Sequence, residues 1–140
     1  MSDKFFLDTN ILVYSFDAKS TKKQARAKEL IEQALNNHNG FISYQVIQEF
    51  LNVASRKFAE PLSLPDCQRY LKYVLTPLCG AFSSIPLYEN ALNISERWQY
   101  SFYDALIIAA ALAMDCKTLY SENLQDGQYI QRLRIENPFA

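Results

Sequence analysis

The sequence has few glycines and no glycine-rich motif. Its three glycines are too widely spaced for a phosphate-binding loop or a dinucleotide fingerprint. It contains one histidine, and no pattern of the Ser-His-Asp hydrolases. These absences argue against a P-loop nucleotidase, a Rossmann dehydrogenase and a serine hydrolase.

Paired cysteines and long apolar runs are also missing. Cys67, Cys79 and Cys116 are odd in number, lack C-x-x-C spacing and lie in apolar contexts, as expected of reduced core residues in a cytoplasmic protein. No signal-peptide pattern is present at the N-terminus. The longest apolar run, 105–114, is shorter than the roughly 20 residues that cross a bilayer. We therefore expect a cytoplasmic protein without a membrane segment.

Charge of either sign is not in excess. The 14 basic and 15 acidic residues leave a net charge of -1, so no overall field marks a nucleic-acid binder. Any nucleic acid would be held by local charge or by metal ions. The apolar fraction of 49% over 140 residues suits one ordinary domain, residues 1–140.

Strand-like and helix-like segments alternate along the chain. We expect a sheet of about five mostly parallel strands, covered by helices on both faces, in an α/β fold. The first expected strand ends at Leu7. Three others cover 41–43, 81–85 and 117–120, and a final edge strand lies around 133–135. The expected helices start after Asp8 and cover 21–36, 44–58, 67–78, 87–99 and 102–115.

Acidic residues recur where this fold would bring them together. Asp8 ends the first strand, Glu49 lies on the helix after the second strand, and Asp104 opens a helix capped by Ser101. A polar cluster, 121–126, follows a later strand. In open α/β sheets, ligands bind outside the carboxyl ends of the strands. We therefore expect these acids to converge on one site.

Carboxylates brought close together repel one another, so their negative charge has to be neutralised. Two carboxylates about 4 Å apart repel by roughly 4 kcal/mol at an effective dielectric of 20. No lysine or arginine accompanies them locally, so cations such as Mg²⁺ or Mn²⁺ are the natural partners. These metals activate water and stabilise the oxyanions of phosphodiester hydrolysis.

Each acid also has a simpler interpretation. Glu49 alone is a solvated glutamate on a helix face. Asp104 alone is the acid of a capping box at the third helical position. Asp126-Gly127 alone is a turn.

The motifs around these acids resemble those of the PIN domain family. The resemblance rests on Leu7-Asp8-Thr9-Asn10-Ile11-Leu12-Val13-Tyr14, on Glu49, and on Phe102-Tyr103-Asp104-Ala105-Leu106-Ile107-Ile108 with the alanines that follow. Tyr120-Ser121-Glu122-Asn123-Leu124-Gln125-Asp126-Gly127 resembles the fourth motif. The resemblance covers nearly the whole chain. A stand-alone PIN domain of this size is most similar to the VapC toxins of toxin–antitoxin pairs.

This resemblance implies a three-layer α/β/α fold and a metal-dependent endoribonuclease, usually a homodimer, inhibited by a small antitoxin. Asp8, Glu49 and Asp104 would then be the catalytic, metal-binding acids. Thr9, Asn10 and Ser121 would orient ligands or water from behind them. The fourth motif departs from the family pattern, because Asn123 stands where many members have aspartate. Asn123, Asp126 and Glu122 are thus three candidates for one position.

Basic residues gather at the start of the second helix. Lys22, Lys23 and Arg26 oppose the helix dipole there, so local helix stability does not explain them. With Arg56, they are candidate contacts for RNA or an antitoxin, and a solvated face is the simpler interpretation.

Two rival functions stay open. One is a catalytically weak PIN fold that serves as an interaction module, which the neutral Asn123 would favour. The other is an RNA-processing PIN nuclease without an antitoxin.

Overall fold

The computed structural model describes residues 3–140; residues 1 and 2 of the expected domain lie outside this range. Within it, six strands form one sheet in the order β3-β2-β1-β4-β6-β5. All neighbouring strands run parallel except β5, which is antiparallel to β6. The strands are β1 (Phe5–Leu7), β2 (Gly40–Ser43), β3 (Cys79–Ala81), β4 (Thr118–Tyr120), β5 (Tyr129–Ile130) and β6 (Leu133–Glu136).

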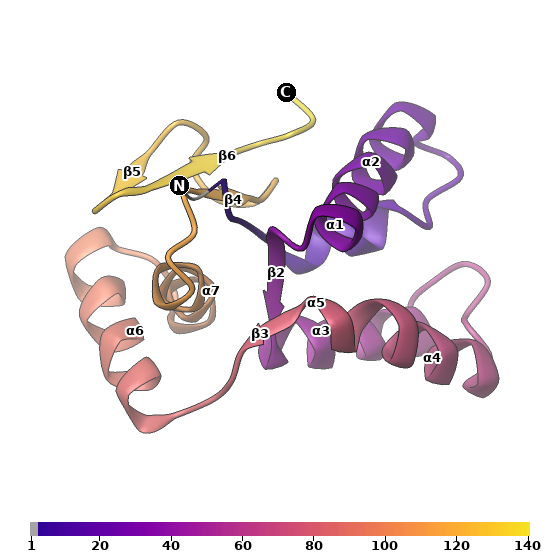
Figure 1. Cartoon of the computed structure of the whole chain (residues 1–140), viewed down its shortest axis with the longest axis horizontal. Coiled ribbons are helices and arrows are strands. Elements are labelled where there is room, and N and C mark those ends of the chain that lie inside the picture. The colour runs from indigo at the N-terminus through magenta and orange to yellow at the C-terminus, as the bar shows by residue number, and fades with distance from the viewer. Residues whose placement is uncertain (1–2) are drawn as a thin grey trace.

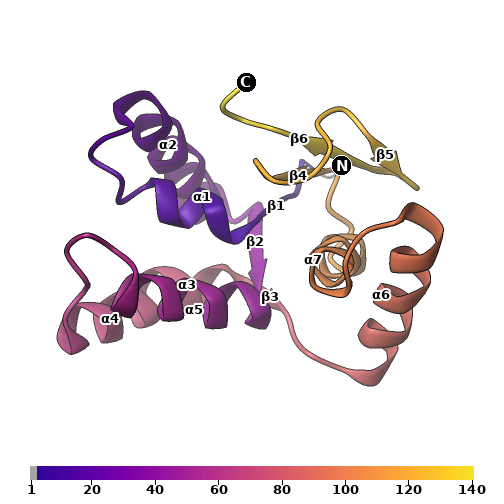
Figure 2. The same cartoon turned by 180° about the vertical axis from the view of Figure 1, so that it is seen from behind.

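Helices cover both faces of this sheet. Figures 1 and 2 show the helices from α1 to α5 on one side and α6 with α7 on the other. The described helices are α1 (Thr9–Tyr14), α2 (Thr21–Asn37), α3 (Tyr44–Arg56), α4 (Leu64–Tyr70), η1 (Leu71–Leu75), α5 (Thr76–Leu78), α6 (Ile85–Trp98) and α7 (Phe102–Ala113). The predicted three-layer α/β/α arrangement is confirmed. No helix in residues 3–140 combines the length and apolarity needed to cross a membrane.

The core lies on both sides of the central strands. All three residues of β1 are buried, as is Leu119 at the centre of β4. Helix α7 buries seven consecutive residues, 105–111. Each fully buried large apolar side chain contributes roughly 1.5–3 kcal/mol relative to exposure. This burial holds the end of β1 and the start of α7 against the same core.

Serine caps fix where four helices begin. The hydroxyl groups of Ser43, Ser63, Ser84 and Ser101 each accept a hydrogen bond from the backbone N–H three residues later. Such a cap contributes about 1 kcal/mol to helix stability. The predicted Ser101 cap is confirmed. Ser43 and Ser101 set the first turns of α3 and α7, which carry two of the three candidate acids.

Three expected elements differ from the structure. The strand expected at 81–85 is β3 (Cys79–Ala81), because Ser84 starts a helix instead. The final strand, β6, is not at the edge, because β5 pairs with its outer side. The helix expected at 67–78 contains a π-helical stretch, η1, directly before α5. Pro77 lies in α5 and cannot donate a backbone hydrogen bond, which accounts for the irregular hydrogen bonding there.

Candidate active site

Asp8 is a buried carboxylate at the carboxyl end of β1. It is the N-cap of α1, and its Oδ1 atom accepts a 2.7 Å hydrogen bond from the backbone N–H of Thr9. Its Oδ2 atom accepts a 2.7 Å bond from the Ser121 hydroxyl, and the Asn10 amide lies 3.5 Å away. These three neighbours fix the orientation of the carboxylate.

The electrostatic surroundings of Asp8 connect it with the other two acids. Burial raises the pKa of Asp8 to about 6, and the hydrogen bonds from Ser121 and Thr9 oppose this rise. The negative charges of Glu49 and Asp104 raise the pKa further. Glu49 and Asp104 therefore lie close enough to act on Asp8, which is the only buried residue of the three predicted acids.

Glu49 is half-buried on α3 and held by two neutral donors. The Thr9 hydroxyl donates a 2.6 Å hydrogen bond to Oε1, and the Gln45 side-chain amide donates a 3.1 Å bond to Oε2. The same Gln45 nitrogen lies 3.1 Å from the backbone carbonyl oxygen of Tyr103. Glu49 is therefore held in place beside Thr9 and is not a freely solvated residue.

Asp104 lies at the third position of α7 and is half-buried. Its backbone N–H donates a 3.2 Å bond to the Ser101 hydroxyl. Its carboxylate accepts no hydrogen bond within residues 3–140, so the reciprocal contact of a capping box is not formed. The side chain is thus available to a ligand.

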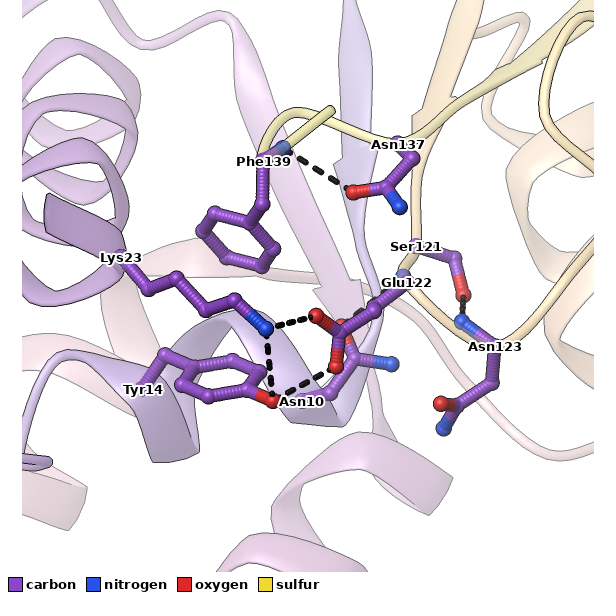
Figure 3. Close-up of polar contacts among 8 residues, drawn as sticks. All are labelled: Asn10, Tyr14, Lys23, Ser121, Glu122, Asn123, Asn137 and Phe139. Atoms are coloured by element: carbon purple, nitrogen blue, oxygen red, sulfur yellow. Dashed lines mark hydrogen bonds and ion pairs between the residues drawn. The ribbon is translucent and has the colours of Figure 1, made fainter. Parts of the chain in front are cut away.

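Glu122 turns toward α1 and α2 (Figure 3). Its Oε2 atom lies 2.6 Å from Lys23 Nζ, and its Oε1 atom accepts a 2.6 Å bond from the Tyr14 hydroxyl. Burial raises the pKa of Glu122, but the bonds from Lys23 and Tyr14 outweigh that effect and leave the pKa below its usual value. Its backbone N–H donates to Asn10 Oδ1 at 3.2 Å. Both oxygens of this candidate acid are therefore occupied by protein groups.

The other two candidates for the fourth position differ from each other. Asn123 is exposed, and its side chain has no hydrogen-bond partner in the described part of the chain; Figure 3 draws a contact only from its backbone nitrogen, to Ser121. Asp126 is exposed too, and its Oδ1 atom accepts a 2.8 Å bond from the backbone N–H of Asn137. Asp126 therefore holds the C-terminal segment through Asn137, whereas the Asn123 side chain bonds to none of the described residues.

The four predicted basic contacts are not equivalent. Lys23 is paired with Glu122, and Arg26 forms an ion pair with Glu29 on its own helix. The guanidinium of Arg26 also lies 6.0 Å from the ring centroid of Tyr120. Lys22 and Arg56 are exposed and form no ion pair within residues 3–140.

The donor set of the three acids suits a hard divalent cation. None of the ion pairs among the described residues involves Asp8, Glu49 or Asp104, so no protein cation competes for them. Carboxylate oxygens are the ligands that Mg²⁺ and Mn²⁺ prefer. No three His, Cys, Asp or Glu side chains in residues 3–140 are gathered closely enough to hold a metal ion. The expected convergence of the acids is therefore seen only as the nearness of Glu49 and Asp104 to Asp8, and their role as one metal site stays a prediction.

Sequence reasoning missed two features of this site. Gln45 contacts Glu49 and the residue before Asp104, and the i, i+4 spacing of Gln45 and Glu49 on one helix was an available signal. The ion pair of Lys23 with Glu122 joins residues 99 apart. No local pattern indicates that contact.

Comparisons with known proteins bear on the family and the fold. The family model described as PIN domain matches residues 5–125. No curated protein matches the chain. Each of three similar solved structures is at most 21% identical to the chain, which shows likeness of fold alone.

The three structures are similar over most of their length. A toxin–antitoxin complex from Klebsiella pneumoniae has a TM-score of 0.70 and 21% identity, covering 96% of this chain and 98% of that one. VapC20 of Mycobacterium tuberculosis, a toxin that cleaves the sarcin-ricin loop, has a TM-score of 0.64 and 19% identity, covering 86% and 90%. DNA-bound VapBC of Salmonella typhimurium has a TM-score of 0.64 and 21% identity, covering 99% of both chains.

Proposed function

The chain belongs to the PIN domain family, and on that premise we propose that it is an endoribonuclease dependent on Mg²⁺ or Mn²⁺. The observation that carries the proposal is the setting of Asp8. A buried carboxylate with a pKa raised to about 6, flanked by the charges of Glu49 and Asp104, is a group that a divalent cation would stabilise. PIN nucleases generally use such a cation.

Asp8, Glu49 and Asp104 would hold the cation, and the neighbouring residues prepare them for it. Ser121 and the Thr9 N–H fix both oxygens of Asp8, and the Thr9 hydroxyl fixes one oxygen of Glu49. A bound divalent cation supplies two effects to phosphodiester hydrolysis, a lower pKa for water and neutralisation of the charge that builds up on phosphate. The free carboxylate of Asp104 gives the site a third oxygen donor.

The biological role that we propose is the toxin of a toxin–antitoxin pair. The support is that similar structures include a toxin–antitoxin complex and a toxin that cleaves the sarcin-ricin loop. On this proposal the chain is a cytoplasmic homodimer whose partners are an RNA substrate and a cognate antitoxin. The exposed Lys22 and Arg56 are available for either partner.

A second candidate function has a specific observation in its favour. Asn123 contributes no charge at the fourth position, and Glu122 and Asp126 already have protein partners. A site with three acids binds a cation less strongly than one with four. A catalytically weak PIN fold that serves as an interaction module would have this composition. An RNA-processing nuclease without an antitoxin would share the active site and lack only the partner.

A cleavage assay separates these functions. Purified protein is incubated with a labelled structured RNA in Mg²⁺, in Mn²⁺ and in EDTA. Defined products that require the metal support a ribonuclease, and intact RNA under all conditions supports the interaction module. A small charged protein encoded beside this one that stops the cleavage supports the toxin over the RNA-processing enzyme.

A further inference from the structure

Gln45 belongs to a line of hydrogen bonds that connects the three chain segments carrying the candidate acids. Its side-chain nitrogen lies 3.1 Å from Glu49 Oε2 and 3.1 Å from the carbonyl oxygen of Tyr103, which directly precedes Asp104. The other oxygen of Glu49 accepts the 2.6 Å bond from Thr9, which directly follows Asp8. A continuous line of hydrogen bonds therefore crosses from α1 through α3 to the first turn of α7.

The chemistry of this contact fixes which way the Gln45 amide faces. Both neighbours, a carboxylate oxygen and a carbonyl oxygen, are acceptors, so only the NH₂ group can face them. The opposite atom, Gln45 Oε1, is buried without a hydrogen-bond partner in the described part of the chain. An unpaired buried acceptor is unfavourable for stability. The orientation of the Gln45 amide therefore satisfies its NH₂ group and leaves its oxygen without a hydrogen bond.

We propose that Gln45 is a positioning residue for the cation site, an inference that rests on the proposed function. It holds the Glu49 carboxylate in one orientation and links it to the turn that presents Asp104. Its neutrality matters as much as its hydrogen bonds. A lysine or arginine at this position would neutralise Glu49 and compete with the cation, whereas an amide orients the carboxylate and leaves its charge available.

A local helix contact is the competing explanation, and the structure distinguishes the two. Gln and Glu four residues apart on one helix often bond for local stability alone. Gln45, however, also reaches Tyr103, which is 58 residues away and on another helix. A contact of purely local value would not need that second acceptor.

The test compares Gln45→Met with Gln48→Met. Methionine keeps the length of the side chain and removes its donors, and Gln48 is an exposed residue on the same helix without a side-chain hydrogen bond in residues 3–140. Mn²⁺ affinity is measured on each purified protein by electron paramagnetic resonance. We expect Gln45→Met to bind Mn²⁺ about tenfold more weakly and Gln48→Met to match the wild type. In cleavage, kcat should fall in Gln45→Met while KM for RNA stays unchanged.

Gln45→Lys tests the role of neutrality. Lysine restores a donor to Glu49, so the melting temperature should stay near that of the wild type, but Mn²⁺ affinity should fall at least as far as in Gln45→Met. Wild-type Mn²⁺ affinity in Gln45→Lys would contradict the argument from charge. Should Gln45→Met fail to fold, Gln45→Ala provides the same comparison.

The outcomes separate failure of this inference from failure of the proposed function. If the wild type binds Mn²⁺ and Gln45→Met binds it equally well, Gln45 does not position the site, and the proposed function stands. If the wild type binds no Mn²⁺ and cleaves no RNA, the proposed function fails and the inference fails with it.

Discussion

The Nζ atom of Lys23 lies 2.6 Å from Oε2 of Glu122, and this ion pair joins helix α2 to the segment that follows β4. The ammonium group also lies 4.7 Å from the ring centroid of Tyr14 and 5.7 Å from that of Phe139. Figure 3 shows Lys23 beside both rings. Lys23 therefore contributes to the structure of this region. Its neighbour Lys22 is exposed and forms no ion pair within residues 3–140.

Substituting these two lysines separately should give different results. Lys22→Ala should weaken RNA binding, because we expect the exposed Lys22 ammonium to contact a phosphate of the RNA. The slope of log binding constant against log salt concentration should become shallower by about one unit. Its melting temperature should not change. Lys23→Ala should lower the melting temperature, because Glu122 loses its cation. Fluorescence anisotropy at several salt concentrations and thermal unfolding measure both effects. Equal behaviour of the two variants would contradict the distinction.

The raised pKa of Asp8 predicts how the stability of the metal-free protein depends on pH. The folded state holds this proton more tightly than the unfolded chain, since the pKa is about 6 in the fold and 3.8 ordinarily. The stabilising contribution is therefore complete below pH 3.8 and is lost as the pH rises through 6. The loss is on the order of 3 kcal/mol.

Urea unfolding of the wild type and of Asp8→Asn, in EDTA between pH 4 and pH 8, measures this contribution. The difference in unfolding free energy between the two proteins should shift in favour of the variant as the pH rises. Mn²⁺ added at pH 7 should stabilise the wild type more than the variant. A difference that stays constant with pH would show that Asp8 titrates normally.

Asn123→Asp tests the fourth position of the site. If Asn123 lines the site, the added charge should tighten Mn²⁺ binding, since the affinity of hard cations rises with ligand charge. Cleavage at low metal concentration should rise, and the metal-free protein should lose some stability. Asp126→Asn is the matched control, because asparagine can still accept the bond from Asn137. An unchanged metal titration in Asn123→Asp would remove Asn123 from the site, and weaker binding in Asp126→Asn would identify Asp126 as the fourth acid.

Gly40 tests the packing of β1, β2 and α2. A Cβ atom at Gly40 would lie 2.2 Å from the Cβ of Ala34 and 2.7 Å from the ring of Phe5. Both neighbours are buried, so Gly40→Ala should destabilise the protein by about 1–3 kcal/mol or more. Gly127→Ala is the comparison, because its φ of +84° is strained for alanine but no atom lies within 4 Å. It should cost roughly 1–2 kcal/mol. Urea unfolding that ranks Gly127→Ala as the more damaging change would contradict the packing described for Gly40.

The layers of the fold could be predicted because their signals are local. The apolar run before Asp8 and the serine before Phe102 place a strand end and a helix start directly. The two-residue strand β5 has no such signal, since Tyr129 and Ile130 are too few to show alternation. Because the sequence does not predict β5, it places β6 at the edge of the sheet.

The site could be predicted only in part, for a related physical reason. Asp8 and Asp104 follow from strand and helix boundaries, whereas the partner of Glu122 depends on how α2 packs against the segment after β4. The sequence therefore predicts Glu122 as a candidate metal-binding acid. In the structure its carboxylate is paired with Lys23 and accepts a hydrogen bond from Tyr14. The metal-binding roles of Asp8, Glu49 and Asp104 stay predictions.

The central claim is that Asp8, Glu49 and Asp104 hold a divalent cation that serves RNA hydrolysis. Its most direct test is the single-turnover rate of RNA cleavage as a function of Mn²⁺ concentration for the wild type and Asp104→Asn. Asp104 accepts no hydrogen bond within residues 3–140, so the variant should fold normally. We predict that Asp104→Asn loses cleavage about 100-fold or more at low Mn²⁺ and recovers part of it at high Mn²⁺, because losing a ligand should cost at least as much as losing a residue that only orients one, which costs about 10- to 100-fold. Cleavage by the variant at the wild-type rate throughout the titration would contradict the account.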